Sequence, residues 1–418
     1  MRAIVRRGWL VPRGRGAAVI FDSLDVSYGE MWGSYRGMTH PDPMSRALAA
    51  RKHAAGKDYA VLLSARERPL ALIEYWPRRM WRVYLFDDRS WCMQMIDFKP
   101  HGTGTLLAQQ NVRWQFSDEH GFASGAWIAQ ETTTVSADGQ VEVRSEFAAA
   151  RGESAGPSQA RTTGPSSDPV RRFPAPVEDF LCPAPEFGDW QVFAPFLAQQ
   201  GHEPATTVVL RDVSVAEGSG PLRATDIEEL FVPGACDTPE GPAVVEPADA
   251  GLLRITSGQL VVSDPGWITE TPRTVTVPPG EFPVTLSLLR TPRGTSVAAA
   301  GVRFLDVPPS EWDMLLQPDE DLELLGEGQF YGVGVDTGTV AFLDATRTVL
   351  EDQLDEDLFE PLDKRLSVEL PGTETEPNLI AFRAGQGDGT YPVWVGRTAD
   401  GQVGCVVVDF QLRSSPRT

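Results

Sequence analysis

The sequence predicts a mainly β, or α+β, protein made of two β-rich antiparallel modules joined by a Pro/Gly/Ser-rich linker. Short apolar or alternating runs recur about every ten residues, with turn residues between them. One stretch between these groups of runs is too small and polar to bury a core. The chain has 418 residues, of which 41% are hydrophobic and 23% charged. This length and composition fit a globular protein of two or three domains.

Residues 1–147 form the predicted first module. Its apolar runs occupy residues 18–22, 59–64, 70–75, 81–86, 92–98 and 112–116. This spacing is typical of an antiparallel meander, which a hairpin around Asp138-Gly139 would close. Residues 44–55 are rich in Ala, Leu, Arg and Lys and end at Gly56, so one helix is expected there. The module is therefore predicted to be an α+β or β-meander domain.

Residues 148–176 are predicted to be a flexible linker or a long surface loop, because Pro, Gly, Ser and Thr dominate them. Residues 177–245 have a mixed pattern and are predicted to be a connecting segment. Within this segment, residues 193–200 favour a short helix and residues 206–213 favour a strand.

Residues 246–418 form the predicted second module, where turn-punctuated strands return. The expected strands are residues 252–255, 259–262, 273–277, 283–289, 297–304, 331–336, 339–343, 378–382, 391–396 and 403–410. Leucines recur every four residues from 350 to 362, which predicts one amphipathic helix. The simplest architecture for this pattern is a sandwich or a strongly bent sheet.

Four segments of the second module resemble a widespread bacterial family that is catalogued as a domain of unknown function. They are residues 258–265 (GQLVVSDP), 277–285 (VPPGEFPVT), 332–345 (GVGVDTGTVAFLDA) and 384–410 (AGQGDGTYPVWVGRTADGQVGCVVVDF). The resemblance covers about residues 240–415 and rests on the motifs GVDxGxxxFxD and GDGxYPVxxG. Some members look like accessory or immunity-type proteins encoded near bacterial toxins, so the resemblance implies protein binding. It implies no chemistry for any particular residue.

Charge is distributed unevenly along the chain. Residues 1–175 carry a net charge of +5 and residues 176–418 a net charge of −26. An acidic surface repels nucleic acid and anionic membranes, so we expect another protein, of basic character, as the partner. No apolar run approaches the length of a transmembrane helix, the first residues lack a signal-peptide pattern, and the four cysteines are widely spaced. A cytoplasmic location is therefore expected.

Five aspartates of the second module each end a predicted strand or lie in a Gly-rich turn. They are Asp264, Asp336, Asp344, Asp388 and Asp409. Carboxylates suit Ca²⁺ and Mg²⁺, so a shared rim of these residues would fit a metal-assisted hydrolase. The alternative, which the sequence favours, is that each aspartate forms a turn by bonding the backbone two residues on. Tyr391 and Trp394 complete the candidate binding residues of this module.

No catalytic residue is predicted. All five histidines precede residue 203, so the second module has no imidazole for a Ser-His-Asp or Cys-His mechanism. No cofactor is expected either, and Ca²⁺ or Mg²⁺ would enter only with the hydrolase alternative. The favoured function is a non-enzymatic, cytoplasmic protein-binding module, of the toxin-neutralising type that the resemblance implies.

The first module is rich in tryptophan, with seven of the eleven among the first 127 residues. Trp76, Arg78, Arg79 and Trp81 form a candidate interface, because Trp and Arg are frequent hot-spot residues. Strand alternation offers a simpler explanation, in which the aromatic residues are buried and the arginines exposed. A third explanation is a sheet face that stacks nucleic-acid bases.

Overall fold

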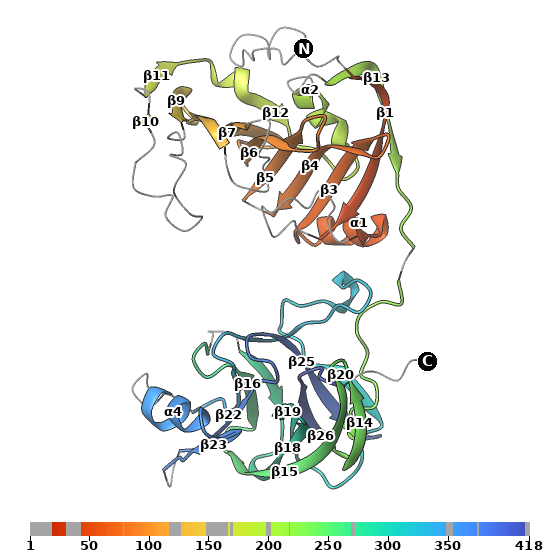
Figure 1. Cartoon of the computed structure of the whole chain (residues 1–418), viewed down its shortest axis with the longest axis vertical. Coiled ribbons are helices and arrows are strands. Elements are labelled where there is room, and N and C mark those ends of the chain that lie inside the picture. The colour runs from red at the N-terminus through yellow and green to blue at the C-terminus, as the bar shows by residue number, and fades with distance from the viewer. Residues whose placement is uncertain are drawn as a thin grey trace. The chain divides into compact units, whose positions relative to one another are not determined.

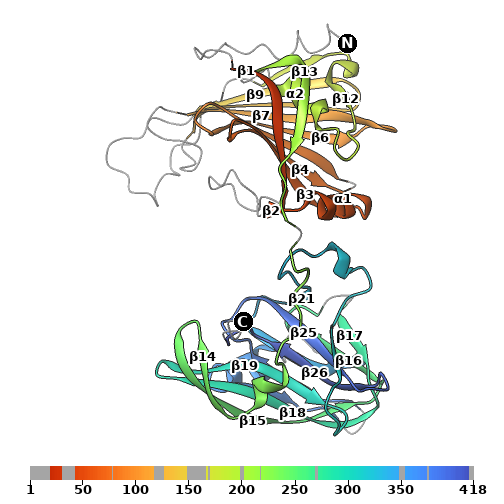
Figure 2. The same cartoon turned by 90° about the vertical axis from the view of Figure 1, so that its right-hand side faces the viewer.

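The structure of the chain is a computed structural model. It describes residues 19–30, 43–77, 79–116, 127–147, 166–167, 170–197, 202–216, 218–268, 272–347, 354–373 and 376–413. These residues form a β-rich, mainly antiparallel protein with few helices, as the sequence predicts. Contacts divide the chain into two units, Met1–Gly218 and Ser219–Thr418. Each unit is described by itself (Figures 1 and 2).

The first unit is built on one curled sheet, with thirteen strands in its described part. The strands are β1 (Val19–Gly29), β2 (Pro43–Met44), β3 (Tyr59–Ala65), β4 (Arg68–Trp76), β5 (Met80–Phe86), β6 (Cys92–Pro100), β7 (Thr105–Phe116), β8 (Trp127–Val135), β9 (Gln140–Phe147), β10 (Ser166–Ser167), β11 (Arg171–Pro174), β12 (Leu181–Pro183) and β13 (His202–Asp212). Strands β3 to β9 pair in chain order, which confirms the predicted meander.

One face of this sheet is covered by short helices. They are α1 (Arg46–Ala54), η2 (Val177–Phe180), η3 (Trp190–Phe193) and α2 (Ala194–Leu197). Helix α1 begins where the Ser45 hydroxyl accepts the Leu48 amide at 3.1 Å. Trp190 and Phe193 are fully buried and pack with Trp81 and Phe98 of the sheet. Burial of these large aromatic side chains supplies much of the unit's hydrophobic stabilisation.

The sheet continues past the stretch that the sequence analysis assigned to a linker. Strand β11 pairs with β9, β12 pairs with β7, and β13 pairs with β1 in parallel. The unit boundary thus falls at Gly218 and not within residues 148–176. The strand predicted over residues 206–213 is present as β13. Strand β11 was not predicted, because all four of its residues are exposed and only its backbone is bonded to the sheet. Residues 148–165 and 168–169 lie outside the described residues.

The second unit is a sandwich of two antiparallel sheets. Its strands are β14 (Gly234–Thr238), β15 (Gly241–Ile255), β16 (Gln259–Ser263), β17 (Arg273–Thr276), β18 (Gly280–Thr291), β19 (Gly294–Arg303), β20 (Glu311–Met314), β21 (Gly332–Val335), β22 (Thr339–Asp344), β23 (Ser367–Leu370), β24 (Leu379–Arg383), β25 (Gly389–Arg397) and β26 (Val403–Asp409). The larger sheet has the order β14-β15-β18-β19-β26-β25-β20, with β21 also on β25. The smaller sheet has the order β17-β16-β22-β24-β23.

The main core of the second unit lies between these two sheets. Val284 and Val406 of the larger sheet pack with Phe342 and Phe382 of the smaller one. The outer faces are also covered. The helical segments are η5 (Glu228–Phe231), η6 (Leu322–Leu324), the π-helical turn η7 (Leu354–Phe359) and α4 (Glu360–Leu362). Segment η5 covers the larger sheet, and η7 with α4 covers the smaller one, where a helix was predicted.

None of the helices in the described ranges is long and apolar enough to cross a membrane. The four cysteines are free thiols: Cys92 and Cys405 are buried, and Cys182 and Cys236 are partly exposed. Burial raises the pKa of Cys92 to about 12 and that of Cys405 to about 11. These two thiols therefore stay protonated and unreactive at neutral pH.

Replacing Trp190 by Ala tests whether residues 177–197 are part of the first core. We expect Trp190→Ala to lower the free energy of unfolding of the first unit by about 3–5 kcal/mol, because it leaves a large cavity. Denaturant titration followed by circular dichroism measures the loss. The exposed Phe173 provides the control, and Phe173→Ala should change stability by less than about 0.5 kcal/mol. A loss below about 1 kcal/mol for Trp190→Ala would show that this segment adds little to the core.

Candidate functional site

Asp264 follows β16 and holds the turn that leads into β22. Its Oδ2 accepts the amides of Asp336 and Thr337, both at 2.8 Å. Its Oδ1 accepts the Thr337 hydroxyl and the Gly266 amide, also at 2.8 Å. The residue as a whole is 2% exposed. With four donors already bound, Asp264 acts as a turn-former that holds the turn in which the chain crosses from β21 of the larger sheet to β22 of the smaller one.

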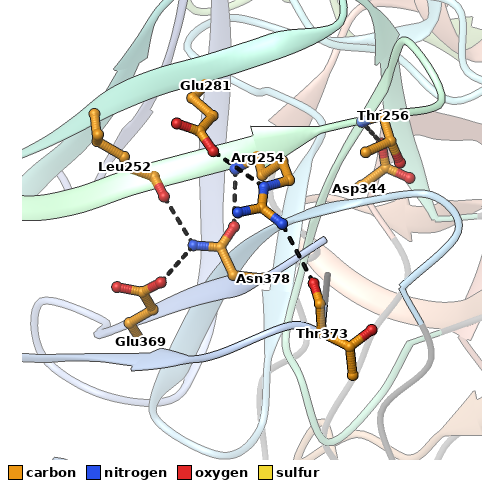
Figure 3. Close-up of polar contacts among 8 residues, drawn as sticks. All are labelled: Leu252, Arg254, Thr256, Glu281, Asp344, Glu369, Thr373 and Asn378. Carbon is orange, nitrogen blue, oxygen red and sulfur yellow. Dashed lines mark hydrogen bonds and ion pairs between the residues drawn. The ribbon is translucent and has the colours of Figure 1, made fainter. Parts of the chain in front are cut away.

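Asp344 performs the same task at the other end of the same strand pair. It ends β22, and its Oδ2 accepts the amides of Thr256 and Ser257 at 2.6 and 2.7 Å, just before β16 (Figure 3). The hydroxyl of Thr346 donates to Oδ1 at 2.6 Å. Burial raises the pKa of Asp344, but the Thr346 hydroxyl and the surrounding amides outweigh burial and hold the pKa below its usual value.

A short internal repeat in the sequence encodes both contacts. Residues 256–264 read TSGQLVVSD and residues 336–344 read DTGTVAFLD, so a hydroxyl residue, a glycine and a later aspartate recur at the same spacing. Gly258 and Gly338 both have positive φ, at 77° and 66°. The strands β16 and β22 are antiparallel neighbours, so each aspartate reaches the turn before the other strand. This repeat is a signal that the sequence analysis missed.

The remaining aspartates do not join these two. Asp336 and Asp388 are exposed in separate turns, and Asp409 accepts the Gln411 amide at 2.8 Å. No group of three or more His, Cys, Asp or Glu side chains that could hold a metal ion occurs in the described ranges, which include all five aspartates. The donor set that a metal-assisted hydrolase needs is therefore not assembled by them.

A third polar joint connects the sheets at Asn378, just before β24 (Figure 3). Its Oδ1 accepts the Arg254 amide at 2.8 Å, and its Nδ2 donates to the Leu252 carbonyl at 2.8 Å. The same nitrogen donates to Glu369 at 2.7 Å. Asn378 thus replaces a neighbouring strand for part of β15. It is 7% exposed and has no surface to offer a ligand.

Tyr391 and Trp394, predicted to bind a partner, are both buried. Tyr391 is 8% exposed and packs against Phe410, and its hydroxyl donates to the Gly387 carbonyl at 2.8 Å. Trp394 is 2% exposed and packs on the opposite face of β25, in the layer that η5 covers. Because both faces of β25 are covered, these side chains serve the core and not a binding surface.

The predicted interface of the first module does not form one surface. Trp81 is 6% exposed and packs in the aromatic core, 4.4 Å from Tyr75 between ring centroids. Trp76 belongs to the other face of the sheet, because it follows Tyr75 along β4. Arg79 is exposed, and Arg78 lies outside the described residues. The burial of Trp81 is what strand alternation alone would produce.

The face that carries Trp76 holds two buried carboxylates, Glu74 and Asp97, that the sequence analysis did not single out. Glu74, Arg82 and Asp97 are direct neighbours on three adjacent strands. Arg82 donates two hydrogen bonds to Asp97, at 2.6 and 2.9 Å, while Glu74 accepts the Tyr84 hydroxyl at 3.3 Å. Glu74 and Asp97 are 1% and 6% exposed. These side chains satisfy one another and explain how the sheet tolerates buried charge.

Two neighbouring apolar side chains close to Asp264 face solvent. Trp267 and Ile268 are 63% and 40% exposed in the turn after Asp264. The Trp267 amide donates to the Asp264 carbonyl at 3.1 Å, so the turn is held by the same residue that connects the sheets. A side chain at Gly266 would approach the Phe359 ring at 3.7 Å, which places the turn beside η7. A single aromatic residue in a turn gives no periodic signal, so its exposure could not be predicted.

Comparison with known families assigns a relationship to the second unit only. Residues 253–408 match the model of a family described as Protein of unknown function (DUF4241). No curated protein and no solved structure matches the chain. The matched range starts within β15 and ends within β26, so it contains both aspartate contacts and Asn378. It leaves out η5, β14 and most of β15.

We expect Asp344→Asn to lower the free energy of unfolding of the second unit by about 1–3 kcal/mol. The amide NH₂ of the new side chain would face the backbone N–H and hydroxyl donors that now bond to the carboxylate. The pKa of Asp344 is depressed on folding. The carboxylate therefore stabilises the fold above its unfolded pKa of about 3.9 and loses that contribution as the pH falls through the folded pKa. The difference between wild type and variant, measured by denaturant titration, should shrink below about pH 4.

Asp388→Asn is the matched control, since Asp388 is exposed, and it should change stability by less than about 0.5 kcal/mol. A melting temperature that rises with Ca²⁺ or Mg²⁺ in the wild type, but not in Asp344→Asn, would contradict the structural role and support the hydrolase alternative.

The matched range should not fold without the residues before it. We expect a 219–418 fragment to unfold cooperatively on heating, and a 253–408 fragment to show no cooperative transition. The shorter fragment loses η5, whose Leu230 covers Ala299 and Val407, and loses the β15 partner of β18. Circular dichroism during a thermal scan compares the two fragments. Equal melting temperatures would show that η5 and β14 are dispensable.

Proposed function

We propose that this protein is a bacterial, cytoplasmic, non-enzymatic binding protein whose second unit recognises a basic protein. Residues 219–418 contain 33 Asp and Glu against 13 Lys and Arg, a net charge of −20. This excess of carboxylates is the observation that carries the proposal. It favours association with a positively charged surface and raises the association rate with such a surface.

The arginines of the second unit do not neutralise the excess carboxylates, because many of these arginines are already paired with other carboxylates. Ion pairs join Arg254 to Glu281, Arg273 to Glu320, Arg290 to Glu246, Arg293 to Glu240, Arg347 to Glu376, Arg397 to Asp313 and Arg413 to Glu229. Each pair removes one positive charge together with one negative charge. The net field of the unit therefore remains strongly negative and acts outward.

The surroundings of the candidate catalytic residues also favour a binding function over catalysis. Asp264 and Asp344 are saturated by backbone and hydroxyl donors and hold turns. The unit has no histidine to act as a general base. Some members of the family that the second unit resembles look like immunity-type proteins, so we propose that the partner is a toxin whose action the protein blocks. A toxin that acts on nucleic acid is commonly basic, because it must hold phosphates, and an acidic binder would mimic those phosphates.

An affinity experiment with the full chain tests this proposal. The immobilised protein is exposed to lysate of its native host, and bound proteins are eluted with rising salt. We expect one basic protein in stoichiometric amount, released as the ionic strength approaches about 1 M, where the Debye length falls to about 3 Å. Recovery of acidic proteins only, or of partners that resist high salt, would contradict recognition through charge.

A further inference from the structure

We propose that the basic partner docks on a composite tip of the second unit, formed by Trp267 and Ile268 together with the carboxylates of η7 and α4. This inference rests on the proposed function, since it names the surface by which the acidic unit would hold its partner. The tip combines an exposed aromatic anchor with a charged border, which is the usual anatomy of a protein interface.

Trp267 is the first element of the tip. At 63% exposure it is the most exposed of the large hydrophobic side chains in the described ranges. A tryptophan usually buries most of its surface, and an exposed one is a characteristic interface anchor. Its backbone is fixed by bonds to Asp264, so little conformational entropy is lost when a partner covers the ring.

The internal repeat shows that this exposure is not imposed by the turn. Arg347 occupies the position equivalent to Trp267, three residues after its aspartate, and its amide donates to the Asp344 carbonyl at 2.9 Å. The Arg347 side chain is only 7% exposed, and its guanidinium approaches the Pro371 carbonyl at 3.4 Å. Two turns of the same kind therefore give opposite results: one buries its side chain and the other presents it.

The second element of the tip is a group of carboxylates on the neighbouring helical segment. Asp355, Glu356, Asp357 and Glu360 are all exposed. Their segment is anchored on the smaller sheet by Leu358, which is fully buried, and it reaches the Trp267 turn through Phe359. Like charges this close repel one another and cost stability, unless a cationic partner offsets them.

The occupant that fits this tip is a basic protein surface with an apolar pocket for the indole ring and arginines or lysines around that pocket. Desolvated indole would supply affinity, and the carboxylates would select positive charge and orient the partner. A nucleic acid does not fit, because phosphates would meet the carboxylates.

Binding of a defined probe to the full chain tests the surface. The probe is a fluorescein-labelled peptide of alternating arginine and leucine residues, and a glutamate-leucine peptide of the same length is its control. Fluorescence anisotropy gives the Kd. We expect the wild type to bind the arginine peptide and not the glutamate peptide. Trp267→Ala should raise the Kd for the arginine peptide at least about tenfold. The triple variant Asp355→Asn, Glu356→Gln, Asp357→Asn should also raise this Kd and should make binding less dependent on salt.

Leu252→Ala is the matched control, because Leu252 is 54% exposed on β15 and lies outside the tip. It should bind as the wild type does. Trp267→Ala and Leu252→Ala should keep the wild-type melting temperature, and the triple variant should not lower it, because that variant removes charges that repel one another. Equal binding by wild type and Trp267→Ala would overturn this docking surface while leaving recognition by the acidic unit intact. No binding of the arginine peptide by the wild type would also overturn it, and the affinity experiment with host lysate then decides the proposed function separately.

Discussion

The second unit depends on two carboxylates that hold the opposite ends of the strand pair β16 and β22. Asp264 at the end of β16 holds the start of β22, and Asp344 at the end of β22 holds the start of β16. Strand β22 is buried along its whole length, with the main core on one face and the layer under η7 on the other. Charge-assisted hydrogen bonds from each aspartate satisfy the backbone amides of the turn that precedes the neighbouring strand.

This arrangement also explains why acidic residues in Gly-rich turns are a poor guide to chemistry. A carboxylate that accepts four or five hydrogen bonds has no lone pair directed outward, and a metal ion would have to displace those donors. The chemistry left to the unit is that of its surface, where excess negative charge and a presented indole ring combine. The recognition that we propose therefore depends on the surface of the sandwich, while its polar interior serves the fold.

Much of the fold could be predicted from the sequence, because alternation and turn chemistry are local signals. The meander of β3 to β9, helix α1 and most strands of the sandwich follow from runs of a few residues, whereas β14, β20 and β23 were not predicted. The strand predicted over residues 206–213 corresponds to β13, but its place in the sheet could not be predicted, since β13 pairs with β1 across most of the unit's sequence. For the candidate site, composition singled out Asp264 and Asp344 but could not assign their donors. It also could not tell that Tyr391 and Trp394 point into covered layers while Trp267 points outward.

The parallel pairing of β1 with β13 has a consequence for the order of events during synthesis. Strand β1 is synthesised long before its partner β13. Residues 19–29 emerge from the ribosome well before residues 202–212 can pair with them. Until then β1 can pair with β3 on one side, but its other edge, which β13 later covers, stays open to other extended chains. Contacts between such distant residues also slow folding. Synthesis of the second unit, which begins a few residues later, would then proceed beside a first unit that has only just closed.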